Sequence, residues 1–229
     1  MSAPTVDNKG FWDRFARIYD PFTAHFSPEY PVLVQRIARD VQEARLVLEV
    51  ATGTGLIALG LGPEQRVDAV DISPGMITQA REKGQALGAD FIRFLVSSAY
   101  NLPWPDGRYD AVICANALHV MEHPGQALDE IKRVLKNGGR LVAPTFCHGE
   151  NRRARTISRL MRLGGFKTYT RFTAASLETL FEEHGFSIVT ADESDEPIPL
   201  CYIVLDAAFR PRTLAASVDR DFSRAGRAG

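Results

Sequence analysis

The chain has 229 residues, 45% of them hydrophobic, which predicts one domain with a substantial core and room for a small insertion. The formal net charge of −1 gives no overall attraction to nucleic acid. The three cysteines, Cys114, Cys147 and Cys201, are odd in number and far apart, which argues against a disulfide framework or a zinc site and favours a cytoplasmic protein. Residues 1–10 are polar, and no apolar run approaches about 20 residues, so we expect neither a signal peptide nor a transmembrane helix.

Two helices are predicted before the first strand. Apolar residues at helical spacing indicate a helix over residues 11–19, and prolines at positions 21, 28 and 31 interrupt the chain before a second helix over residues 32–41. Two interpretations remain open. The helices either only cover the edge of the sheet, or they form a lid over a ligand.

The stretch over residues 46–58 predicts a buried strand, a glycine turn and the start of a short helix. Gly53 and Gly55 allow tight backbone angles and a close approach to a ligand. The amide groups at the start of the next helix favour an anionic group at the same place. That helix is short, because Gly60, Gly62 and Pro63 end it.

Strands and helices alternate after the glycine turn. Strands are predicted over residues 67–71, 92–96, 111–115 and 140–144, with helices over residues 73–86 and 125–135 between them, the second ending at a C-cap signal over residues 137–139. A helix over residues 152–163 interrupts this order, and a helix over residues 174–184 and strands over residues 187–191 and 200–209 follow. The last two strands are joined too closely for a helical crossover, so they should pair antiparallel.

This order predicts an α/β fold: a doubly wound, mostly parallel, seven-stranded sheet with an antiparallel last strand. An N-terminal helical lid and a helical insertion after the fifth strand complete it. We divide the single domain into a lid (residues 1–45), a ligand-binding core (46–145), the insertion (146–172), a C-terminal helix with the antiparallel strands (173–210) and a disordered tail (211–229). The ligand site should lie at the carboxyl ends of the parallel strands.

Asp71 ends the second strand, where an acidic side chain can accept hydrogen bonds from both ribose hydroxyls. Two cofactors suit a glycine turn followed by this acid. Residues 53–58 match the loose dinucleotide pattern G-x-G-x-x-G/A, and residues 49–55 resemble motif I of the class I S-adenosylmethionine (SAM)-dependent methyltransferases, with Ala51 in place of the first glycine.

Three further segments resemble the same family in the same order. They are residues 101–110, which resemble the family's approach to its fourth strand, residues 117–120 just after that strand, and residues 130–139, with Asn137 where the family has proline. The resemblance covers about residues 46–145 and is strongest to ubiquinone and menaquinone C-methyltransferases and small bacterial phospholipid N-methyltransferases. It implies SAM as the cofactor and methyl transfer to a small-molecule or lipid acceptor, either a quinone or phenol-like ring or a phospholipid amine.

The resemblance also implies roles for individual residues. Glu49 and the turn Ala51, Thr52, Gly53, Thr54 and Gly55 should hold the amino-acid end of SAM, and Asp71 the ribose. Ile72 should pack on the adenine, while Met76 either closes the far side of that ring or packs in the core. The remaining residues expected to bind SAM are Ser98, which is shorter and neutral where the family often has aspartate, Ala99, Tyr100, Asn116 and Tyr19.

Methyl transfer needs a base only if the acceptor atom carries a proton at neutral pH. His119, just after the fourth strand, is the candidate, and the alternative is a packing or solvated histidine. Tyr19 is a second candidate for a catalytic role. No pair of carboxylates follows the fourth strand, so we expect no metal site.

Arg152, Arg155, Arg159 and Arg162 share one stripe of the helix predicted over residues 152–163. Such a basic amphipathic helix suits an anionic membrane, which would place the protein at the inner membrane face, although a solvated surface helix has the same pattern. Two rival functions remain open. One is an NAD-dependent oxidoreductase, which would want a longer first helix, and the other is a SAM-binding protein without activity.

Overall fold

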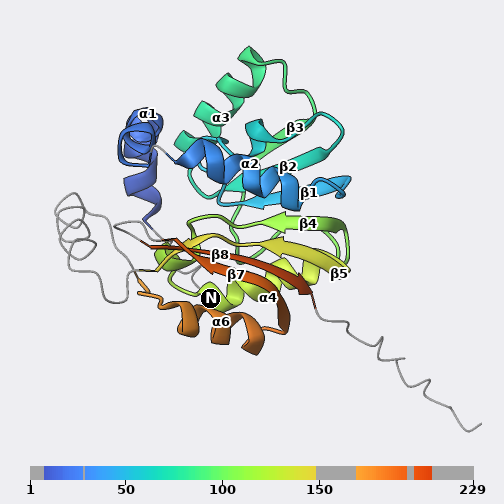
Figure 1. The fold of residues 1–229 in the computed structure, drawn as a ribbon. Coiled ribbons are helices and arrows are strands. Elements are labelled where there is room, and N and C mark those ends of the chain that lie inside the picture. The colour runs from blue at the N-terminus through green and yellow to red at the C-terminus, as the bar shows by residue number, and fades with distance from the viewer. Residues whose placement is uncertain (1–7, 28, 148–168, 195–198, 208–229) are drawn as a thin grey trace, which may run out of the picture.

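The computed structural model describes residues 8–27, 29–147, 169–194 and 199–207. Helices and strands alternate through most of this part of the chain (Figure 1). The helices are α1 (Lys9–Phe26), α2 (Tyr30–Asp40), α3 (Pro74–Ala86), α4 (Pro124–Val134) and α6 (Ala174–Glu183), with short 3₁₀ helices η1 (Ala58–Gly60) and η2 (Leu118–Val120). The strands are β1 (Leu46–Val50), β2 (Arg66–Asp71), β3 (Ile92–Val96), β4 (Tyr109–Ile113), β5 (Leu135–Val142), β6 (Thr145–Phe146), β7 (Phe186–Glu193) and β8 (Leu200–Ala207).

The strands form one mixed sheet in the order β3-β2-β1-β4-β5-β8, with β6 and β7 also paired to β8. Strands β1 to β5 are parallel, whereas β8 runs antiparallel to β5, β6 and β7. This confirms the predicted doubly wound, mostly parallel sheet with an antiparallel end. The two-residue strand β6 is an addition to the seven strands that the sequence predicts.

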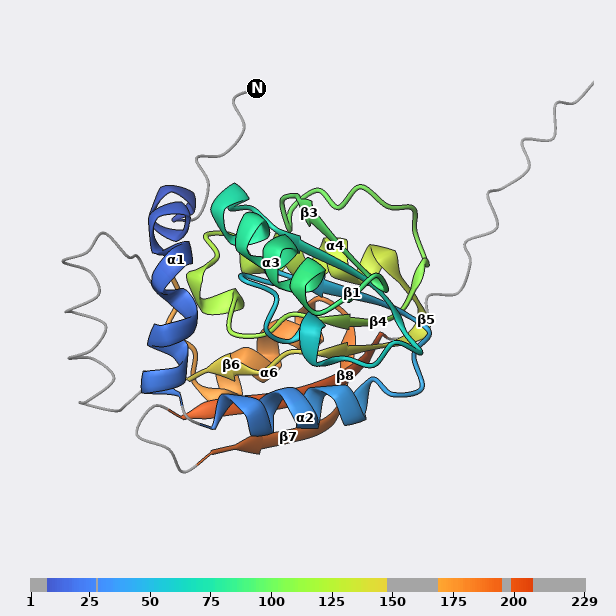
Figure 2. The ribbon, with the colours of Figure 1, turned by 90° about the horizontal axis from the view of Figure 1, so that it is seen from above.

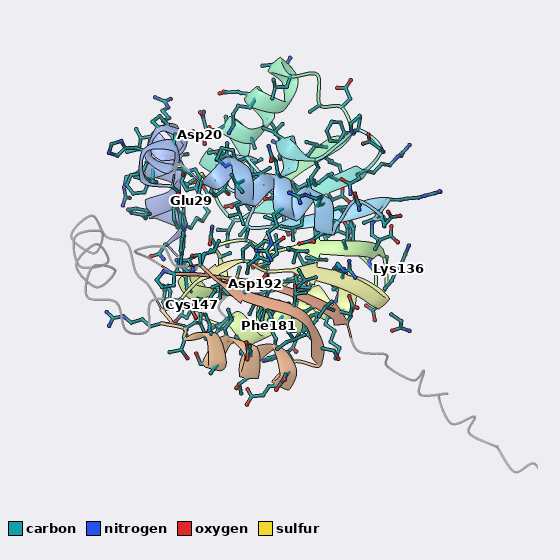
Figure 3. All side chains as sticks on the ribbon, in the orientation of Figure 1. Asp20, Glu29, Lys136, Cys147, Phe181 and Asp192 are labelled. Atoms are coloured by element: carbon teal, nitrogen blue, oxygen red, sulfur yellow. A yellow bond between two sulfur atoms is a disulfide. The ribbon has the colours of Figure 1, made fainter. Side chains whose placement is uncertain are left out.

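Helices cover both faces of the sheet (Figures 1 and 2). On one face Leu128 of α4 and Phe181 of α6 belong to a buried cluster with β4, β5 and β8, and Figure 3 places Phe181 on α6. On the other face Ile37 of α2 and Ile77 of α3 belong to a second buried cluster with β1 and β2. The core strands are therefore enclosed on both sides, as the apolar run of β1 predicts.

Helix α1 is longer than predicted. It continues through Pro21 to Phe26, whereas the sequence suggested an end at Tyr19. Proline removes one helical hydrogen bond but does not prevent the chain from continuing as a helix when packing supports it. Ala16 and Thr23 lie on either side of the proline and are both buried, so tertiary packing holds α1 together across Pro21.

Strand β5 begins earlier than predicted. The sequence suggested a helix C-cap over residues 137–139, but α4 ends at Val134 and Leu135 already pairs with Tyr109 of β4. The register then shifts, so that Arg140 pairs with Ala111 and the intervening residues, with Gly138 at φ 70°, bulge out. Gly138 and Gly139 thus lie in a bulge of the sheet and not at the end of a helix.

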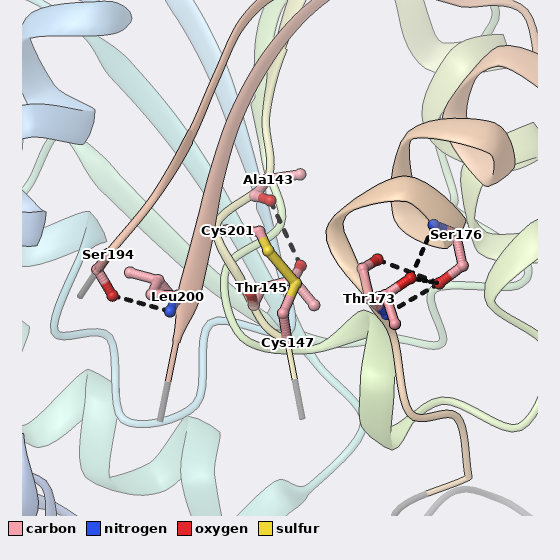
Figure 4. The surroundings of a disulfide bond; sticks show 8 residues. All are labelled: Ala143, Thr145, Cys147, Thr173, Ser176, Ser194, Leu200 and Cys201. Atoms are coloured by element: carbon pink, nitrogen blue, oxygen red, sulfur yellow. Dashed lines mark hydrogen bonds between the residues drawn. A yellow bond between two sulfur atoms is a disulfide. The ribbon is translucent and has the colours of Figure 1, made fainter. Parts of the chain in front are cut away.

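The expectation of no disulfide was wrong. Cys147 and Cys201 form a disulfide bond between the end of β6 and β8, and their Cα atoms are 6.0 Å apart (Figure 4). The pairing of Thr145 with Cys201 brings the two cysteines together, although 54 residues separate them in the sequence. Cys114 is a free, buried cysteine.

The predicted helix over residues 152–163 and the predicted tail over residues 211–229 lie outside the described residues. Within the described part of the chain, no helix is both long and apolar enough to cross a membrane.

Candidate cofactor site

The turn after β1 has an unusual backbone. Ala51, Gly53 and Gly55 all have positive φ angles of 58°, 56° and 81°. This conformation disfavours a side chain by about 1–2 kcal/mol, which explains why the family prefers glycine where this chain has Ala51. The turn is tied to the next strand, because the Thr52 amide donates to the Val70 carbonyl at 2.9 Å. It therefore presents its backbone at the carboxyl ends of β1 and β2.

Gly55 is required by packing inside the protein. A Cβ atom at this position would lie 2.9 Å from Cε1 of Phe94 and 3.2 Å from Cβ of Ala80. The site is therefore built against β3 and α3 from behind. Gly53 has more room, since the nearest atom to an added Cβ is Cε1 of Tyr19 at 3.9 Å.

Glu49 supports the turn from below. Its Oε2 accepts a hydrogen bond from Oγ1 of Thr52 at 2.6 Å and from the Ala58 amide at 3.0 Å. Its side chain is almost completely buried. Burial raises the pKa of Glu49 to about 8, although the two hydrogen bonds lower it. Glu49 thus fixes both ends of the turn.

Asp71 joins β2 to the turn. Its Oδ2 accepts from the Gly53 amide at 2.8 Å, and its Oδ1 accepts from the Ser73 amide at 2.9 Å. Burial raises the pKa of Asp71, while these backbone amides lower it. The carboxylate lines a pocket, so lone pairs not used by the two amides can accept from a ligand.

Helix α1 forms another wall of the site. Asp20 accepts hydrogen bonds from Oγ1 of Thr54 in the turn and from Nζ of Lys83 in α3, the second at 2.7 Å. Tyr19 lines the pocket, and burial raises the pKa of its hydroxyl to about 12, so it remains protonated and able to donate at neutral pH. Figure 2 shows α1 standing across one end of the sheet, and the bond between Asp20 and Thr54 ties this helix to the turn.

The opposite wall follows β4. Asn116 has a left-handed backbone with φ 52°, and its amide donates to the Pro144 carbonyl at 2.7 Å. Its Oδ1 atom is buried and has no hydrogen-bond partner among the described residues. A buried acceptor without a donor is costly, so it suits a ligand that brings one. Val120 and Met121 continue this wall with apolar side chains.

His119 lies behind that wall. Its side chain is buried, and its ring centroid is 6.0 Å from that of Phe146. Its backbone carbonyl accepts from the amides of Tyr169 and Thr170 at 3.1 and 3.3 Å. Ala117, two positions before it, and Val120, the next residue, line the pocket, whereas His119 is not among the lining residues.

In the loop after β3, some residues line the pocket and others form hydrogen bonds that hold the loop in place. Ser97 and Ala99 line the pocket. Ser98 turns to its own loop, where its Oγ accepts from the Tyr100 amide at 3.2 Å. The Tyr100 hydroxyl accepts from the His123 amide at 3.3 Å, so this side chain is directed to the start of α4.

All these walls enclose one pocket, with about 720 Å³ of empty space that includes open solvent. Eight of the predicted residues line it: Tyr19, Ala51, Gly53, Asp71, Ile72, Met76, Ala99 and Asn116. The other predicted residues, Glu49, Thr52, Thr54, Gly55, Ser98, Tyr100 and His119, stand outside the lining.

Sequence reasoning missed seven lining residues: Trp12, Val70, Ser97, Ala115, Ala117, Val120 and Met121. Trp12 could have been found, because it lies seven positions before Tyr19 and a helix places such residues on one face. The others follow or end strands and carry no chemical signal of their own. Among the described residues, no group of three His, Cys, Asp or Glu side chains is placed to hold a metal ion.

The sequence pattern of the family described as "Methyltransferase domain" matches residues 48–143. The chain is 43% identical over 103 residues to a demethylmenaquinone methyltransferase of Thermus thermophilus, a match that covers 44% of this chain and 46% of the relative. It is 30% identical over 154 residues to the demethylmenaquinone methyltransferase of Clavibacter sepedonicus, which covers 67% of this chain and 59% of the relative. The chain thus spans about half the length of the curated relatives it matches.

Solved structures share the fold at low identity. A methyltransferase of Haloferax volcanii, solved in complex with the Trm112 methyltransferase activator, superposes with a TM-score of 0.69 at 20% identity, covering 86% of this chain and 98% of that one. An O-methyltransferase structure from Nostoc punctiforme gives a TM-score of 0.68 at 22% identity, covering 89% and 62%. Together with the match over residues 48–143, these likenesses show that the chain carries a methyltransferase domain with the class I, SAM-dependent methyltransferase fold.

Proposed function

We propose that the protein transfers a methyl group from SAM to a small aromatic or lipid-like acceptor. The observation that carries this proposal is the link between Asp71 and the Gly53 amide. This hydrogen bond joins two features of one pocket wall. One is a carboxylate that could accept hydrogen bonds from ribose hydroxyls, and the other is a turn with a left-handed backbone. A nucleoside with an amino-acid arm suits both.

The residues of the pocket fit SAM. Asp71 would accept from the ribose hydroxyls, and Ile72 and Met76 would pack on the adenine. The buried Oδ1 of Asn116 would accept from the ammonium group at the other end. When bound, SAM supplies an electrophilic methyl group on a sulfonium.

The protein's share of the reaction is orientation and exclusion of water. Ala117, Val120 and Met121 form an apolar wall beyond Asn116 and keep that side of the pocket dry. Holding an acceptor atom in line with the methyl group in such a site can supply most of the rate enhancement.

Binding experiments separate the cofactor alternatives. Calorimetry should show heat with S-adenosylhomocysteine and none with NAD, since η1 is a single 3₁₀ turn rather than the long helix of a dinucleotide site. Heat with NAD alone would reject the proposal. A protein that binds S-adenosylhomocysteine but never transfers label from SAM to any acceptor would be a binding protein without activity.

For the acceptor we propose a quinone-like or phenolic ring. The relatives are demethylmenaquinone methyltransferases, and the apolar wall at Val120 and Met121 suits a ring. Labelled SAM should transfer its methyl group to a demethylated naphthoquinone. Transfer to phosphatidylethanolamine instead would establish the phospholipid alternative.

We propose His119 as the base for acceptors that must lose a proton, because Ala117, two positions before it, and Val120, just after it, both line the pocket. His119→Ala should then lower turnover by about 10²–10⁴-fold while affinity for S-adenosylhomocysteine changes little. His25→Ala, at an exposed position on α1, is the control. Full activity of His119→Ala at pH 7 would assign this histidine to packing against Phe146.

We also propose peripheral binding to anionic membranes. It is supported by the spacing of Arg152, Arg155, Arg159 and Arg162 in the sequence. The protein should sediment with anionic but not with neutral vesicles at low salt, and less so when the four arginines are changed to glutamine. Equal sedimentation with both kinds of vesicle would reject this proposal.

A further inference from the structure

Trp12 of α1 lines the pocket together with Ile72, just after β2, and Met76 of α3, which lie on the expected adenosine side. We infer that Trp12 contacts the adenosine part of the bound cofactor, and that Asp13 positions it by fastening α1 to the start of α3. This inference rests on the proposed function, because it assigns two further residues to the same site.

Asp13 holds the start of α3 directly. Its Oδ1 accepts from Oγ of Ser73 at 2.5 Å and from the Gly75 amide at 3.0 Å. Burial raises the pKa of Asp13, but these hydrogen bonds and Lys9 bring it below its usual value, so the carboxylate is charged at neutral pH. A negative charge is favourable at the N-terminus of a helix, which the start of α3 provides.

Ser73 connects this contact to the ribose carboxylate. Its amide donates to Oδ1 of Asp71 at 2.9 Å, while its hydroxyl donates to Asp13 and accepts from the Met76 amide at 3.1 Å. One fully buried serine therefore joins α1, α3 and Asp71. Because Trp12 is the residue just before Asp13 in the helix, a shift of Asp13 should also move Trp12.

The backbones of α1 and α3 are in close contact at this point. A Cβ atom on Gly75 would lie 3.0 Å from the carbonyl oxygen of Asp13 and 3.1 Å from its Cα. Such an approach leaves little freedom for the helix turn that carries Trp12. The close contact therefore fixes the rotation of α1 about its axis at the residue next to Trp12.

A second anchor fixes the other end of this helix segment. Asp20 bonds Thr54 and Lys83, and it lies two helical turns after Asp13 on the same side of α1. Trp12 and Tyr19 precede the two aspartates and their ring centroids are 6.3 Å apart at an interplanar angle of 76°. The two aromatic rings thus form one continuous cover over the pocket, held at both ends by a carboxylate.

Tryptophan fluorescence tests the contact, because the chain has only two tryptophans. Trp104 is buried and packs edge-on against Tyr109 at 5.4 Å, outside the pocket. In the Trp104→Phe variant, titration with S-adenosylhomocysteine should change the emission of Trp12 with the affinity that calorimetry gives. In the Trp12→Phe variant the emission should not respond. A response from Trp104 alone would overturn the inference.

Affinity gives a second reading. Trp12→Ala should weaken binding of S-adenosylhomocysteine by about tenfold, as expected for the loss of an aromatic contact. Wild-type affinity in Trp12→Ala would overturn the contact and leave the proposed function intact. No binding by the wild-type protein would instead reject the proposed function.

The role of Asp13 is tested by a double-mutant cycle. Asp13→Ala should weaken binding by about the same factor as Trp12→Ala, and the double variant should lose little more than either single one, because coupled residues are not additive. Asp13→Asn, which keeps an acceptor oxygen, should restore most of the affinity. Additive losses, or no rescue by asparagine, would overturn the positioning role.

Asp110 provides a matched control. This carboxylate also accepts backbone amides, those of Arg45 and Leu46, and it pairs with Lys136. Figure 3 shows Lys136 at the end of the molecule opposite Asp20 and α1. Asp110→Ala should therefore leave both the affinity for S-adenosylhomocysteine and the response of Trp12 unchanged. An equal loss in Asp110→Ala would mean that the Asp13 effect is general destabilisation.

Discussion

The carboxylate of Asp71 accepts a hydrogen bond from the Gly53 amide at 2.8 Å, so the acid at the end of β2 and the turn after β1 form one unit. Asp71→Ala removes this acceptor and its charge. Affinity for S-adenosylhomocysteine should fall by roughly ten- to a hundredfold, as expected for the loss of a charged hydrogen-bond partner worth about 1.5–3 kcal/mol. Calorimetry measures the affinity and a thermal melt checks the fold. Unchanged affinity in a folded variant would exclude Asp71 from the site.

Gly55 and Gly107 form a matched pair for testing the tight packing behind the turn. Both have positive φ angles, 81° and 64°. A Cβ added at Gly55 would lie 2.9 Å from Phe94, whereas a Cβ added at Gly107 would have no atom within 4 Å. Gly107→Ala should lower the free energy of unfolding by about 1–2 kcal/mol for the backbone alone. Gly55→Ala should lower it further by about 1–3 kcal/mol, the usual effect of overpacking. Urea unfolding measures the free energy of unfolding of both variants. Equal decreases would show that the Phe94 side chain moves aside at no cost in stability.

Glu49 should make the stability of the protein without cofactor depend on pH. Its pKa is raised by burial from the ordinary value of 4.5 to about 8, so between these values the folded state retains a proton that the unfolded state has lost. The contribution of Glu49 to stability is therefore full below pH 4.5 and is lost as pH rises toward 8, by at most about 1.4 kcal/mol per pH unit.

The Glu49→Gln variant isolates this effect, because glutamine is close in size and does not ionise. Its free energy of unfolding should fall less steeply than that of the wild type between pH 5 and 8. The raised pKa of Asp71 acts in the same direction but remains in both proteins, so it cancels in the difference. Parallel pH profiles of the two proteins would show that Glu49 is ionised in the folded state throughout this range.

The Cys147–Cys201 disulfide should be measurable both as chemistry and as stability. Without reductant, the denatured chain should expose one reactive thiol, that of Cys114, and three after reduction. Because the bond closes a loop across 54 positions, Cys201→Ser should lower the free energy of unfolding by about 2–4 kcal/mol under oxidising conditions. Added reductant should bring the wild type to the same value. Cys114→Ala is the control, because this variant keeps the disulfide and should still lose stability when reductant is added. Three reactive thiols in the denatured chain without reductant would contradict the bond.

Much of the site could be predicted because its signals are local. The positive φ angles of the turn at Gly53 and Gly55 favour glycine, and the apolar run of β1 indicates burial on both faces. Asp71 was found for the same reason, since the end of a parallel strand faces the ligand edge. The division of the nearby loop was not predictable. Whether Ser97 or Ser98 faces the pocket depends on the hydrogen bond from Tyr100 to Ser98, which the sequence does not encode visibly.

The sequence by itself determined the order of strands and helices, the glycine turn and the acid that follows it, because periodicity and backbone preference act over a few residues. Only the tertiary structure decided that α1 continues through Pro21, that Trp12 reaches the pocket and that Cys147 meets Cys201. Each of these depends on partners distant along the chain: Asp13 bonds Ser73 across 60 positions, and β6 meets β8. Packing between such partners outweighs local preference, and a single sequence does not reveal which partners meet.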